Sequence, residues 1–340
     1  MKAKLQARRR DDRPKLQEII PLDTPLIIFV DPSDRCNLLC HFCPTGDHEL
    51  MNNTEGRNFG PMPYGLFEKI IGDIGKFPHP IKVLRLYKEG EPLANPRFAD
   101  MVRLAKRSGR IDVVDTTTNA VLLNKEKALA IVDAGLDRMN ISIYGMDNAQ
   151  YSQFSGRSVN FDELVSNIAY FYEISRGTTT INIKINGDVV PGGAEQKFLE
   201  TFGDICDEIN IEHVMACWSG FDFDGHGVKI NQSLTIYGRP LINEVLVCPY
   251  IFYSFSINSD GSASVCFLDW DRRRIIGNVN VENVVEIWHG EPMRAYQKMM
   301  LSGHRKSYGP CASCGQMTHG EPDNIDPFRE SLLEKLVQIA

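Results

Sequence analysis

Three cysteines lie within eight positions of the stretch DRCNLLCHFCPTG, and this spacing constrains the chain more than any other feature. A four-iron cluster has four iron corners, so thiolates from Cys36, Cys40 and Cys43 would leave one iron open to a ligand from solution. A structural zinc site normally closes with four protein ligands. No histidine follows at zinc-finger spacing, since His41 lies inside the motif and His48 comes shortly after it. The spacing therefore favours an iron–sulfur cluster over zinc.

The remaining six cysteines form one group and two isolated positions. The group, Cys248, Cys266, Cys311 and Cys314, lies near the C-terminus, and Cys206 and Cys217 stand alone before it. The chain has 340 residues, 43% of them hydrophobic, so it can bury a large core, and no apolar run approaches the ~20 residues that a membrane span requires. We therefore expect a cytoplasmic protein, whose cysteines serve as metal ligands or catalytic thiols rather than as disulfides.

Charge indicates neither a nucleic acid nor a membrane as partner. The net charge is −7, and the basic run Arg8–Arg10 is followed directly by Asp11 and Asp12. Mixed charges of this kind predict a solvated N-terminal arm rather than a nucleic-acid-binding patch.

Apolar β-branched runs alternate with amphipathic segments in the order of βα units. Strands are predicted near 26–30, 81–86, 111–115, 138–143, 180–185 and 211–215. Helices are predicted near 64–76, 97–108, 124–134, 161–175 and 194–208, with stop signals at Gly109, Gly135 and Gly177. Right-handed crossovers between six parallel strands would give an α/β fold, a partial (β/α)6 barrel with binding residues at the carboxyl ends of its strands.

With an aromatic residue before its last cysteine, the pattern of Cys36, Cys40, Phe42 and Cys43 resembles the signature of the radical S-adenosylmethionine (SAM) family. The resemblance extends over about residues 20–320. It implies a [4Fe–4S] cluster with an open iron site, where SAM is chelated and reductively cleaved to a 5′-deoxyadenosyl radical. It further implies a flavodoxin- or ferredoxin-type electron donor and an enzyme that takes hydrogen from an unactivated C–H bond.

The same resemblance assigns SAM contacts after the second, third and fourth strands. Gly90 and Glu91 match the family's Gly-Gly-Glu-Pro segment, which holds the methionine ammonium, whereas Glu89 replaces its first glycine. At that position we expect an ordinary negative φ. Asn119 matches a polar residue near the ribose. A plain strand-to-helix turn remains the alternative for the segment around Gly90.

Two further positions match residues that approach the carboxylate of SAM in the family. These are Ser142 and Arg157, and a guanidinium suits a carboxylate because its planar fork donates two parallel hydrogen bonds. A surface arginine without a ligand is the alternative for Arg157. Tyr144 stands where the family has an aspartate, which predicts a differently shaped substrate pocket.

The C-terminal cysteines resemble the SPASM and twitch extensions of the same family. Cys248, Gly261 and Cys266 have the opening spacing of these extensions, and the turn at Gly261 predicts a β-hairpin that brings the two cysteines together. ENVVEIWHGEPMRAYQKMM is then predicted as a helix before Cys311 and Cys314. No cysteine follows Cys314, so one auxiliary [4Fe–4S] cluster is expected rather than two, with a zinc-ribbon-like site as the alternative.

These patterns divide the chain into five predicted parts. They are an N-terminal arm (1–20), a radical SAM partial barrel (21–217), a linker (218–247), a small auxiliary-cluster domain of hairpin plus helix (248–320) and a C-terminal helix (321–340).

The resemblance identifies the chemistry rather than the substrate. We expect oxidation or epimerisation of a small polar substrate, carbohydrate or aminocyclitol-like, in a natural-product or carbohydrate pathway. The alternatives are a maturase of ribosomal peptides and a non-enzymatic zinc or iron–sulfur protein. Peptide-modifying relatives often carry an N-terminal leader-binding module, and the first ~20 residues are too few to form one, which favours the small substrate.

The two isolated cysteines receive different predictions. Cys206 is expected in the helix FLETFGDICDEI as a small buried residue. Cys217 is expected where the sixth strand reaches the barrel mouth. It is either a buried structural thiol or the donor that returns a hydrogen atom to the opposite face of the substrate, which would make the enzyme an epimerase rather than a dehydrogenase.

Overall fold

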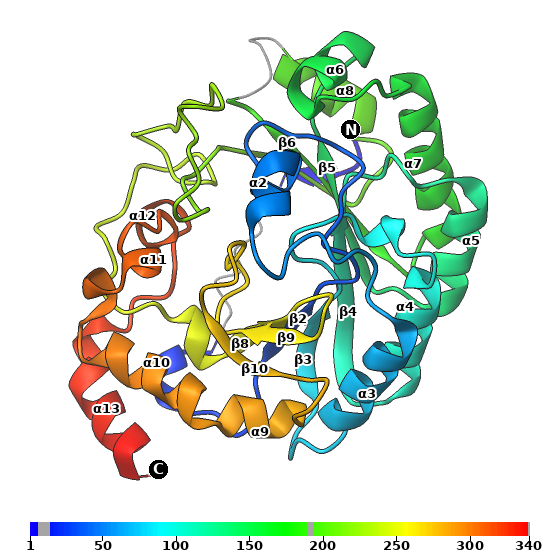
Figure 1. Cartoon of the computed structure of the whole chain (residues 1–340). Coiled ribbons are helices and arrows are strands. Elements are labelled where there is room, and N and C mark those ends of the chain that lie inside the picture. The colour runs from blue at the N-terminus through cyan, green and yellow to red at the C-terminus, as the bar shows by residue number, and fades with distance from the viewer. Residues whose placement is uncertain (6–13, 189–193, 339–340) are drawn as a thin grey trace.

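The computed structural model describes residues 1–5, 14–188 and 194–338, and its described strands form one curved sheet (Figure 1). Their order along the sheet is β1-β7-β6-β5-β4-β3-β2-β8-β9-β10. The strands are β1 (Lys4–Leu5), β2 (Ile27–Val30), β3 (Ile81–Arg85), β4 (Ile111–Thr118), β5 (Arg138–Ile143), β6 (Thr180–Asn186), β7 (Glu208–Glu212), β8 (Ser254–Ile257), β9 (Ser262–Ser264) and β10 (Ile275–Asn278). Strands β2 to β7 pair in parallel, each with the next in the chain. This confirms the predicted α/β fold with a partial (β/α)6 barrel.

Helices between the barrel strands lie along the outside of the curved sheet (Figure 1). They are α3 (Tyr64–Ile74), α4 (Phe98–Arg107), α5 (Lys125–Ala134), α6 (Asn148–Ser155), α7 (Phe161–Ser175) and α8 (Ala194–Phe202). The others are α1 (Leu16–Ile19), α2 (His48–Asn53), α9 (Val284–His289), α10 (Glu291–Leu301), α11 (Gly309–Ala312), α12 (Gln316–His319) and α13 (Arg329–Gln338). No helix of the described ranges is long and apolar enough to cross a membrane.

Side-chain caps and glycines set the helix ends that the sequence predicted. Asn124 begins α5 by accepting a hydrogen bond from the backbone N–H of Lys127 at 2.9 Å. The chain leaves α5 through Gly135, whose φ of 83° lies in the left-handed region that glycine adopts without strain. Gly109 and Gly177 have φ of 63° and 78°, which confirms the three stop signals.

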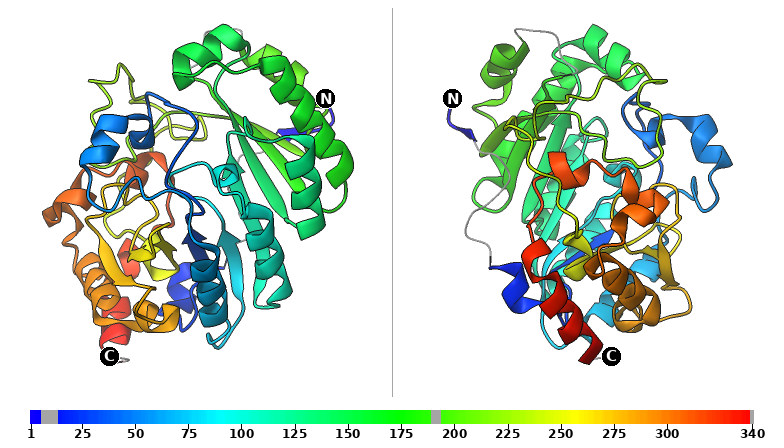
Figure 2. Two further views of the ribbon diagram at one scale, coloured as in Figure 1. Left: turned by 45° about the vertical axis from the view of Figure 1, so that its right-hand side comes forward. Right: turned by 90° about the vertical axis from the view of Figure 1, so that its left-hand side faces the viewer.

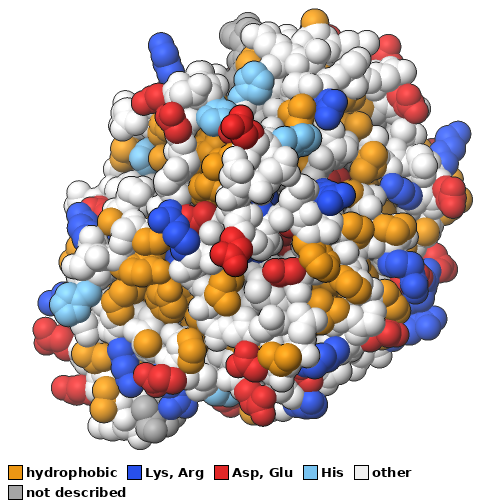
Figure 3. Space-filling view, viewed as in Figure 1, with side chains coloured by type: hydrophobic (Ala, Val, Ile, Leu, Met, Phe, Trp, Pro, Cys, Tyr) orange, Lys and Arg blue, Asp and Glu red, His pale blue; other side chains and the backbone are white. Residues whose placement is uncertain are grey.

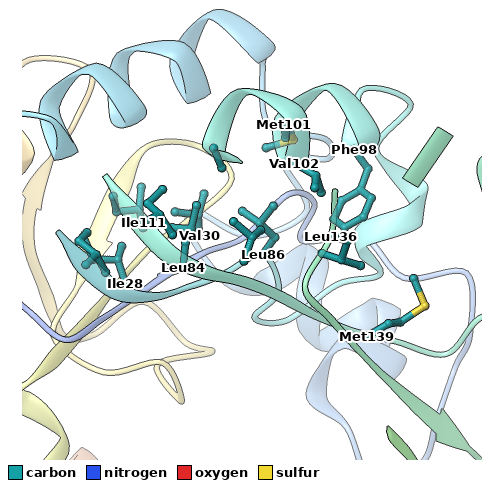
Figure 4. Packing of buried hydrophobic residues seen from close by; sticks show 14 of the residues in the cluster. Ile28, Val30, Leu84, Leu86, Phe98, Met101, Val102, Ile111, Leu136 and Met139 are labelled. Carbon is teal, nitrogen blue, oxygen red and sulfur yellow. The ribbon is translucent and has the colours of Figure 1, made fainter. Parts of the chain in front are cut away.

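The main core lies between the barrel strands and these helices. Figure 4 shows Ile28 and Val30 of β2 and Leu84 of β3 beside Met101 and Val102 of α4, and all five side chains are fully buried. Alternate residues of a strand point to opposite faces, so the same strands present a second set of side chains to the barrel interior. Burial of each large apolar side chain stabilises the fold by roughly 1.5–3 kcal/mol.

The C-terminal hairpin continues the barrel sheet instead of forming a sheet of its own. Strands β8 and β9 are antiparallel, and the N–H of Gly261 donates to the carbonyl of Asn258 at 2.9 Å, which confirms the predicted turn. Strand β8 also pairs in parallel with β2, over Ile27–Ser254 to Val30–Ile257. The hairpin therefore lies beside β2 and β3, away from α5 and α7 (Figure 1, Figure 2).

Several predicted element boundaries are wrong. The single helix expected over 282–300 is two helices, α9 and α10, because Gly290 is extended (φ −69°, ψ 156°) and Pro292 lies in the first turn of the second one. Helix α8 ends at Phe202, not at 208, and β7 begins at Glu208, not at 211. The chain turns at Gly203, whose carbonyl accepts hydrogen bonds from the backbone of Lys2 and Ala3.

Part of the expected N-terminal arm belongs to the sheet. Strand β1 pairs in parallel with β7, so residues 1–5 are not a free arm. The charged run from Arg8 to Asp12 lies outside the described residues.

Candidate functional site

The cysteine loop follows β2 at the carboxyl end of the barrel, and one glycine of its own and two of other segments let it pack closely. A Cβ atom on Gly46 would lie 2.3 Å from the carbonyl oxygen of Cys40, and one on Gly90 would lie 2.0 Å from that of Ser33. A Cβ atom on Gly156, after α6, would lie 2.9 Å from Cβ of Leu39 and 3.1 Å from its carbonyl oxygen. Backbone contacts therefore fix the loop between the ends of β3 and α6.

The thiols of this loop lie close together, with Cys40 buried and Cys36 and Cys43 half-buried. Burial, then the Glu91 carboxylate, raises the pKa of Cys36 to about 12. The pKa of Cys40 is raised well above its usual range by burial and then by Cys43 and Cys36, and burial also raises the pKa of Cys43. Three close thiolates are therefore unfavourable here without bound cations, so this donor set fits an iron–sulfur cluster.

Glu91 joins the ends of β3 and β4 next to the cysteine loop. Its buried carboxylate accepts hydrogen bonds from the hydroxyl of Thr118 at 2.5 Å and from the backbone N–H groups of Leu93 and Asn119 at 3.0 and 2.9 Å. The backbone N–H of Glu91 donates to the carbonyl of Arg35 at 2.9 Å. Glu91 thus positions this region, and its contact with the ammonium of SAM stays a prediction.

Asn119 lies directly against the cysteine loop. Its side-chain nitrogen donates to the side-chain oxygen of Asn37 at 2.9 Å and lies 3.7 Å from Sγ of Cys36. The structure therefore brings Gly90, Glu91 and Asn119 together with the first cysteine group.

Ser142 and Arg157 occupy different surroundings. Ser142 is buried on β5, two residues before Tyr144, whose ring centroid lies 5.5 Å from that of Phe42. Tyr144 therefore borders the cysteine loop. Arg157 is exposed after α6, and no described residue forms an ion pair with its guanidinium. Its role toward SAM stays a prediction.

Three asparagines inside the barrel were missed from the sequence. Asn140, Asn182 and Asn210 lie on β5, β6 and β7 and are at most 5% exposed. Asn182 Nδ2 donates to Asn140 Oδ1 at 3.3 Å, whereas Oδ1 of Asn182 and both amide atoms of Asn210 have no hydrogen-bond partner in the described structure. The alternation of Asn with Ile in RMNISI, INIKIN and EINIE was the available signal.

The four C-terminal cysteines also gather at one place. Burial raises the pKa of Cys248 well above its usual range, and the next causes are Cys266, Cys314 and Cys311. Burial raises the pKa of Cys266 to about 12 and that of Cys311 to about 11. Such a donor set fits the expected auxiliary cluster.

Two buried arginines lie beside this group. Arg274 opposes the rise in the pKa values of Cys266, Cys311 and Cys314, and Arg305 opposes it at Cys311 and Cys314. Arg274 Nε lies 2.9 Å from an Asp269 carboxylate oxygen, and Arg305 donates to the carbonyls of Leu246 at 2.9 Å and Cys311 at 2.7 Å. Positive charge beside these thiols favours their ionised form, in which they bind a metal cluster.

Cys217 lies between the two cysteine groups, although it is not at the end of a strand. Strand β7 ends at Glu212, and the loop beyond it packs on the second group, where Ala216 accepts a hydrogen bond from Gly315 at 2.8 Å. The pKa of Cys217 is raised by burial and then by Cys314 and Cys43. Cys206 is buried as expected but lies after α8, where its thiol donates to the carbonyl of Phe202.

Family models match two regions of the chain. Residues 30–205 match the radical SAM superfamily, and residues 248–315 match SPASM, an iron–sulfur cluster-binding domain. These regions contain the first and the second cysteine group, respectively.

Relatives with described activities match about half of the chain. A tungsten-containing aldehyde ferredoxin oxidoreductase cofactor-modifying protein of Pyrococcus furiosus is 29% identical over 161 residues, 46% of this chain and 42% of that protein. A GTP 3′,8-cyclase of Aquifex aeolicus is 28% identical over 181 residues, 53% of this chain and 52% of that protein. The chain therefore matches about half the length of these proteins.

Solved structures with this fold cover more of the chain. BtrN in complex with AdoMet and 2-DOIA has a TM-score of 0.53 and 16% identity, covering 85% of this chain and 92% of that one. SuiB of Streptococcus suis bound to its precursor peptide SuiA has a TM-score of 0.61 and 18% identity, covering 89% and 72%. At these identities the likeness concerns the fold alone. Because the superfamily model spans more than half of its residues and the SPASM model follows it, this chain belongs to the radical SAM superfamily and carries a C-terminal SPASM domain.

Proposed function

We propose that this radical SAM enzyme takes a hydrogen atom from a C–H bond of a small, hydroxyl-rich, carbohydrate-like substrate and thereby oxidises or epimerises it. The observation that carries the proposal is the polar lining of the barrel. Strands β5 to β7 direct polar side chains inward, among them Asn140, Ser142, Asn182, Lys184, Asn210 and Glu212. These three strands offer many hydrogen-bonding groups to a polar molecule, whereas β2 contributes the aromatic ring of Phe29, which stacks on Phe267.

The first cysteine group would hold the [4Fe–4S] cluster of the radical SAM domain. Its ligands would be Cys36, Cys40 and Cys43, with Gly90, Glu91, Asn119, Ser142 and Arg157 around SAM. When bound, these cofactors supply a 5′-deoxyadenosyl radical. A flavodoxin- or ferredoxin-type protein would provide the electron.

The chain's own residues enclose the barrel mouth. The segment after β7 packs Phe221 and Phe223 against Trp270 of the SPASM domain and Met51 of α2. Trp270 Nε1 donates to the carbonyl of Ser219 at 3.0 Å. An enclosure of this kind keeps water and stray hydrogen donors away from a radical and admits a small substrate more readily than a folded peptide.

Oxidation and epimerisation differ in what happens to the substrate radical. Loss of one electron and one proton gives an oxidised product, and the SPASM cysteines would hold a cluster that can exchange an electron. Epimerisation instead needs a hydrogen atom delivered to the opposite face. Cys217 is our proposed donor because it is half-buried and interacts with thiols of both cysteine groups, Cys314 and Cys43.

Anaerobic reconstitution tests the proposal. The enzyme would be incubated with sugars, sugar acids, sugar phosphates, aminocyclitols and peptides, and 5′-deoxyadenosine formation above the substrate-free background would be measured. A product two mass units lighter than the substrate indicates oxidation. A product of unchanged mass in H2O that gains one deuterium in D2O indicates epimerisation. In the second case Cys217→Ala should abolish inversion and the buried-thiol control Cys206→Ala should not. Stimulation by peptides alone would contradict the proposal in favour of a peptide maturase.

A further inference from the structure

Glu89, which stands where the family has a glycine, lies at the centre of a buried group of charges. Its Oε2 lies 2.5 Å from Arg57 Nη1 and 3.2 Å from Arg272 Nη2, and Lys88 Nζ contacts its Oε1. All four side chains are at most 5% exposed. The Glu89 carboxylate therefore contacts three cations, and Arg272 also interacts with the carboxyl groups of Asp31, Asp260 and Asp34. A buried excess of positive charge is costly unless an anion compensates it.

Four members of this site, Asp31, Arg272, Glu89 and Arg57, have buried polar atoms without hydrogen-bond partners in the described structure. Both carboxyl oxygens of the fully buried Asp31 are unpartnered. Arg272 forms the ion pair with Glu89, but Nε, Nη1 and Nη2 of Arg272 make no hydrogen bond. Buried polar groups are almost always hydrogen-bonded in native proteins, so atoms left over inside a candidate site indicate a ligand.

The other two cations have partners of their own. Arg57 donates to the carbonyl of Trp270 at 2.9 Å and to the hydroxyl of Thr45 at 3.0 Å, and Lys88 donates to the carbonyl of Asp269 at 3.0 Å. These bonds hold Arg57 and Lys88 in place. Apart from Nε of Arg57 and Oε2 of Glu89, which pairs with Arg57 and Arg272, the unpartnered atoms of the group are those of Arg272 and Asp31.

The group lies where a substrate would meet the cofactors. Asp31 directly follows β2 and precedes the cysteine loop, and Glu89 directly precedes Gly90, which packs on that loop. Arg272 comes from the SPASM loop between β9 and β10, with a φ of 57° that is unusual for a non-glycine residue. Both halves of the enzyme thus contribute.

We propose that Arg272, supported by Lys88, binds an oxyanion of the substrate, a phosphate or a carboxylate, and that Asp31 hydrogen-bonds a hydroxyl of the same molecule. A guanidinium fork matches the two oxygens of such a group. This inference rests on the proposed function and narrows its substrate to an acidic sugar rather than an aminocyclitol.

The surrounding charges support an anionic ligand. Burial and then the Glu89 carboxylate raise the pKa of Asp31 to about 8, so this carboxyl is mostly protonated at neutral pH and adds little negative charge. Asp34 accepts hydrogen bonds from the backbone of Phe59 and Gly60, at 2.9 and 2.7 Å. On the face seen in Figure 3, in contrast, acidic and basic side chains are interspersed.

Binding measurements on the reconstituted, SAM-bound enzyme test the inference without turnover. Titration calorimetry would compare glucose, glucosamine, glucose 6-phosphate and glucuronate, which share a scaffold and differ in charge. We expect at least one of the two anions to bind tenfold or more tightly than glucose and glucosamine. A preference for the phosphate or for the carboxylate identifies which oxyanion the site takes.

Variants then assign the preference to one residue. Arg272→Gln should remove it, and Arg272→Lys, which keeps the charge without the fork, should retain part of it. The matched control is Arg273→Gln in the same loop, where the side chain is 55% exposed and pairs with Asp271, and it should bind the ligands as the wild type does. The anion preference is measured on the wild-type enzyme first. A folding defect in one of the variants therefore cannot by itself support or refute the inference.

Two outcomes would overturn the inference. One is that neither anion binds the wild type more tightly than glucose, including the case of no binding at all. The other is that Arg272→Gln weakens SAM binding by the same factor, which would assign the arginine to the carboxylate of SAM. Failure of the proposed function is distinct, because it appears as absent substrate-dependent 5′-deoxyadenosine even where the anion preference is found.

Discussion

Gly90→Ala tests whether the close contact between the end of β3 and the cysteine loop positions the cluster ligands. A Cβ atom at this position would lie 2.0 Å from the carbonyl oxygen of Ser33, 2.6 Å from that of Arg35 and 2.7 Å from the carbonyl carbon of Asp34. All three atoms belong to the backbone, so no side-chain rotation relieves the overlap. Because real Cβ atoms essentially never lie within 3.0 Å of such atoms, the loop must move by about 1 Å.

A displacement of this size should affect the cofactor site more than the fold. Overpacking a close contact destabilises a protein by about 1–3 kcal/mol, which a chain with a large core can tolerate. Ligand constellations, in contrast, must be held to within about 0.5 Å. The shift also strains the hydrogen bond that joins the N–H of Glu91 to the carbonyl of Arg35, now 2.9 Å long. We therefore expect SAM binding at least tenfold weaker, with the variant still folded.

Calorimetry of SAM binding and electron paramagnetic resonance of the reduced cluster, with and without SAM, would measure this effect. The matched control is Gly72→Ala in α3, where an added Cβ meets no atom within 4 Å and helix propensity should stabilise the protein by about 0.5–1 kcal/mol. If Gly90→Ala binds SAM with wild-type affinity and gives the same spectral change, the contact does not position the site.

Three further changes give distinct readouts. Replacing Cys36, Cys40 and Cys43 together by alanine should leave about half of the iron, that of the auxiliary cluster, and abolish SAM cleavage; cleavage that persists would refute the ligand assignment. Arg274→Gln removes a cation that lowers the pKa values of Cys266 and Cys311, so the auxiliary iron should be lost more readily to a chelator while SAM binding is kept; unchanged iron retention would contradict this. Burial and then Glu89 raise the pKa of Asp31 from 3.8 to about 8; Asp34 adds to this rise, and Lys88 and Arg272 oppose it. Between pH 4 and 8 the folded protein therefore keeps a proton on Asp31 that the unfolded chain has released. Its contribution to the free energy of unfolding therefore falls between pH 4 and 8, and denaturant titration should find Asp31→Asn more stable relative to wild type at pH 8.5 than at pH 4.5; a difference independent of pH would show that Asp31 does not titrate in this range.

The barrel could be predicted from the sequence because buried parallel strands and amphipathic helices have different local patterns. Ile28 and Val30 of β2, for example, belong to a short apolar run that favours a strand. The turn at Gly261 was equally local. The pairing of β8 with β2 was not predicted, because a strand's own residues do not specify which edge it joins. Strand β1 was missed for the same reason, and two residues give no periodicity.

The cysteine ligands could be proposed because their spacing is visible along the sequence. The polar interior of the barrel could not, because it depends on which residues of neighbouring strands lie opposite each other. Asn140 and Asn182 become neighbours because β5 and β6 pair residue for residue. Either asparagine alone, inside an apolar run, predicts nothing about its neighbours. The position of Cys217 was predicted only approximately, because β7 ends earlier than expected and the loop after it, not the strand, carries this thiol between the two cysteine groups.

Glu89 departs from the family pattern, and only the structure shows which residues surround it. The sequence identifies this residue as the replacement of a glycine, and φ is not positive there, as expected. An isolated buried carboxylate would have a raised pKa, but Arg272, Arg57 and Lys88 outweigh the effect of burial and lower the pKa of Glu89 to about 2. These cations come from three separate segments, and Arg272 comes from the SPASM domain. The carboxylate and its cations therefore act as one unit, which links the barrel to the SPASM domain.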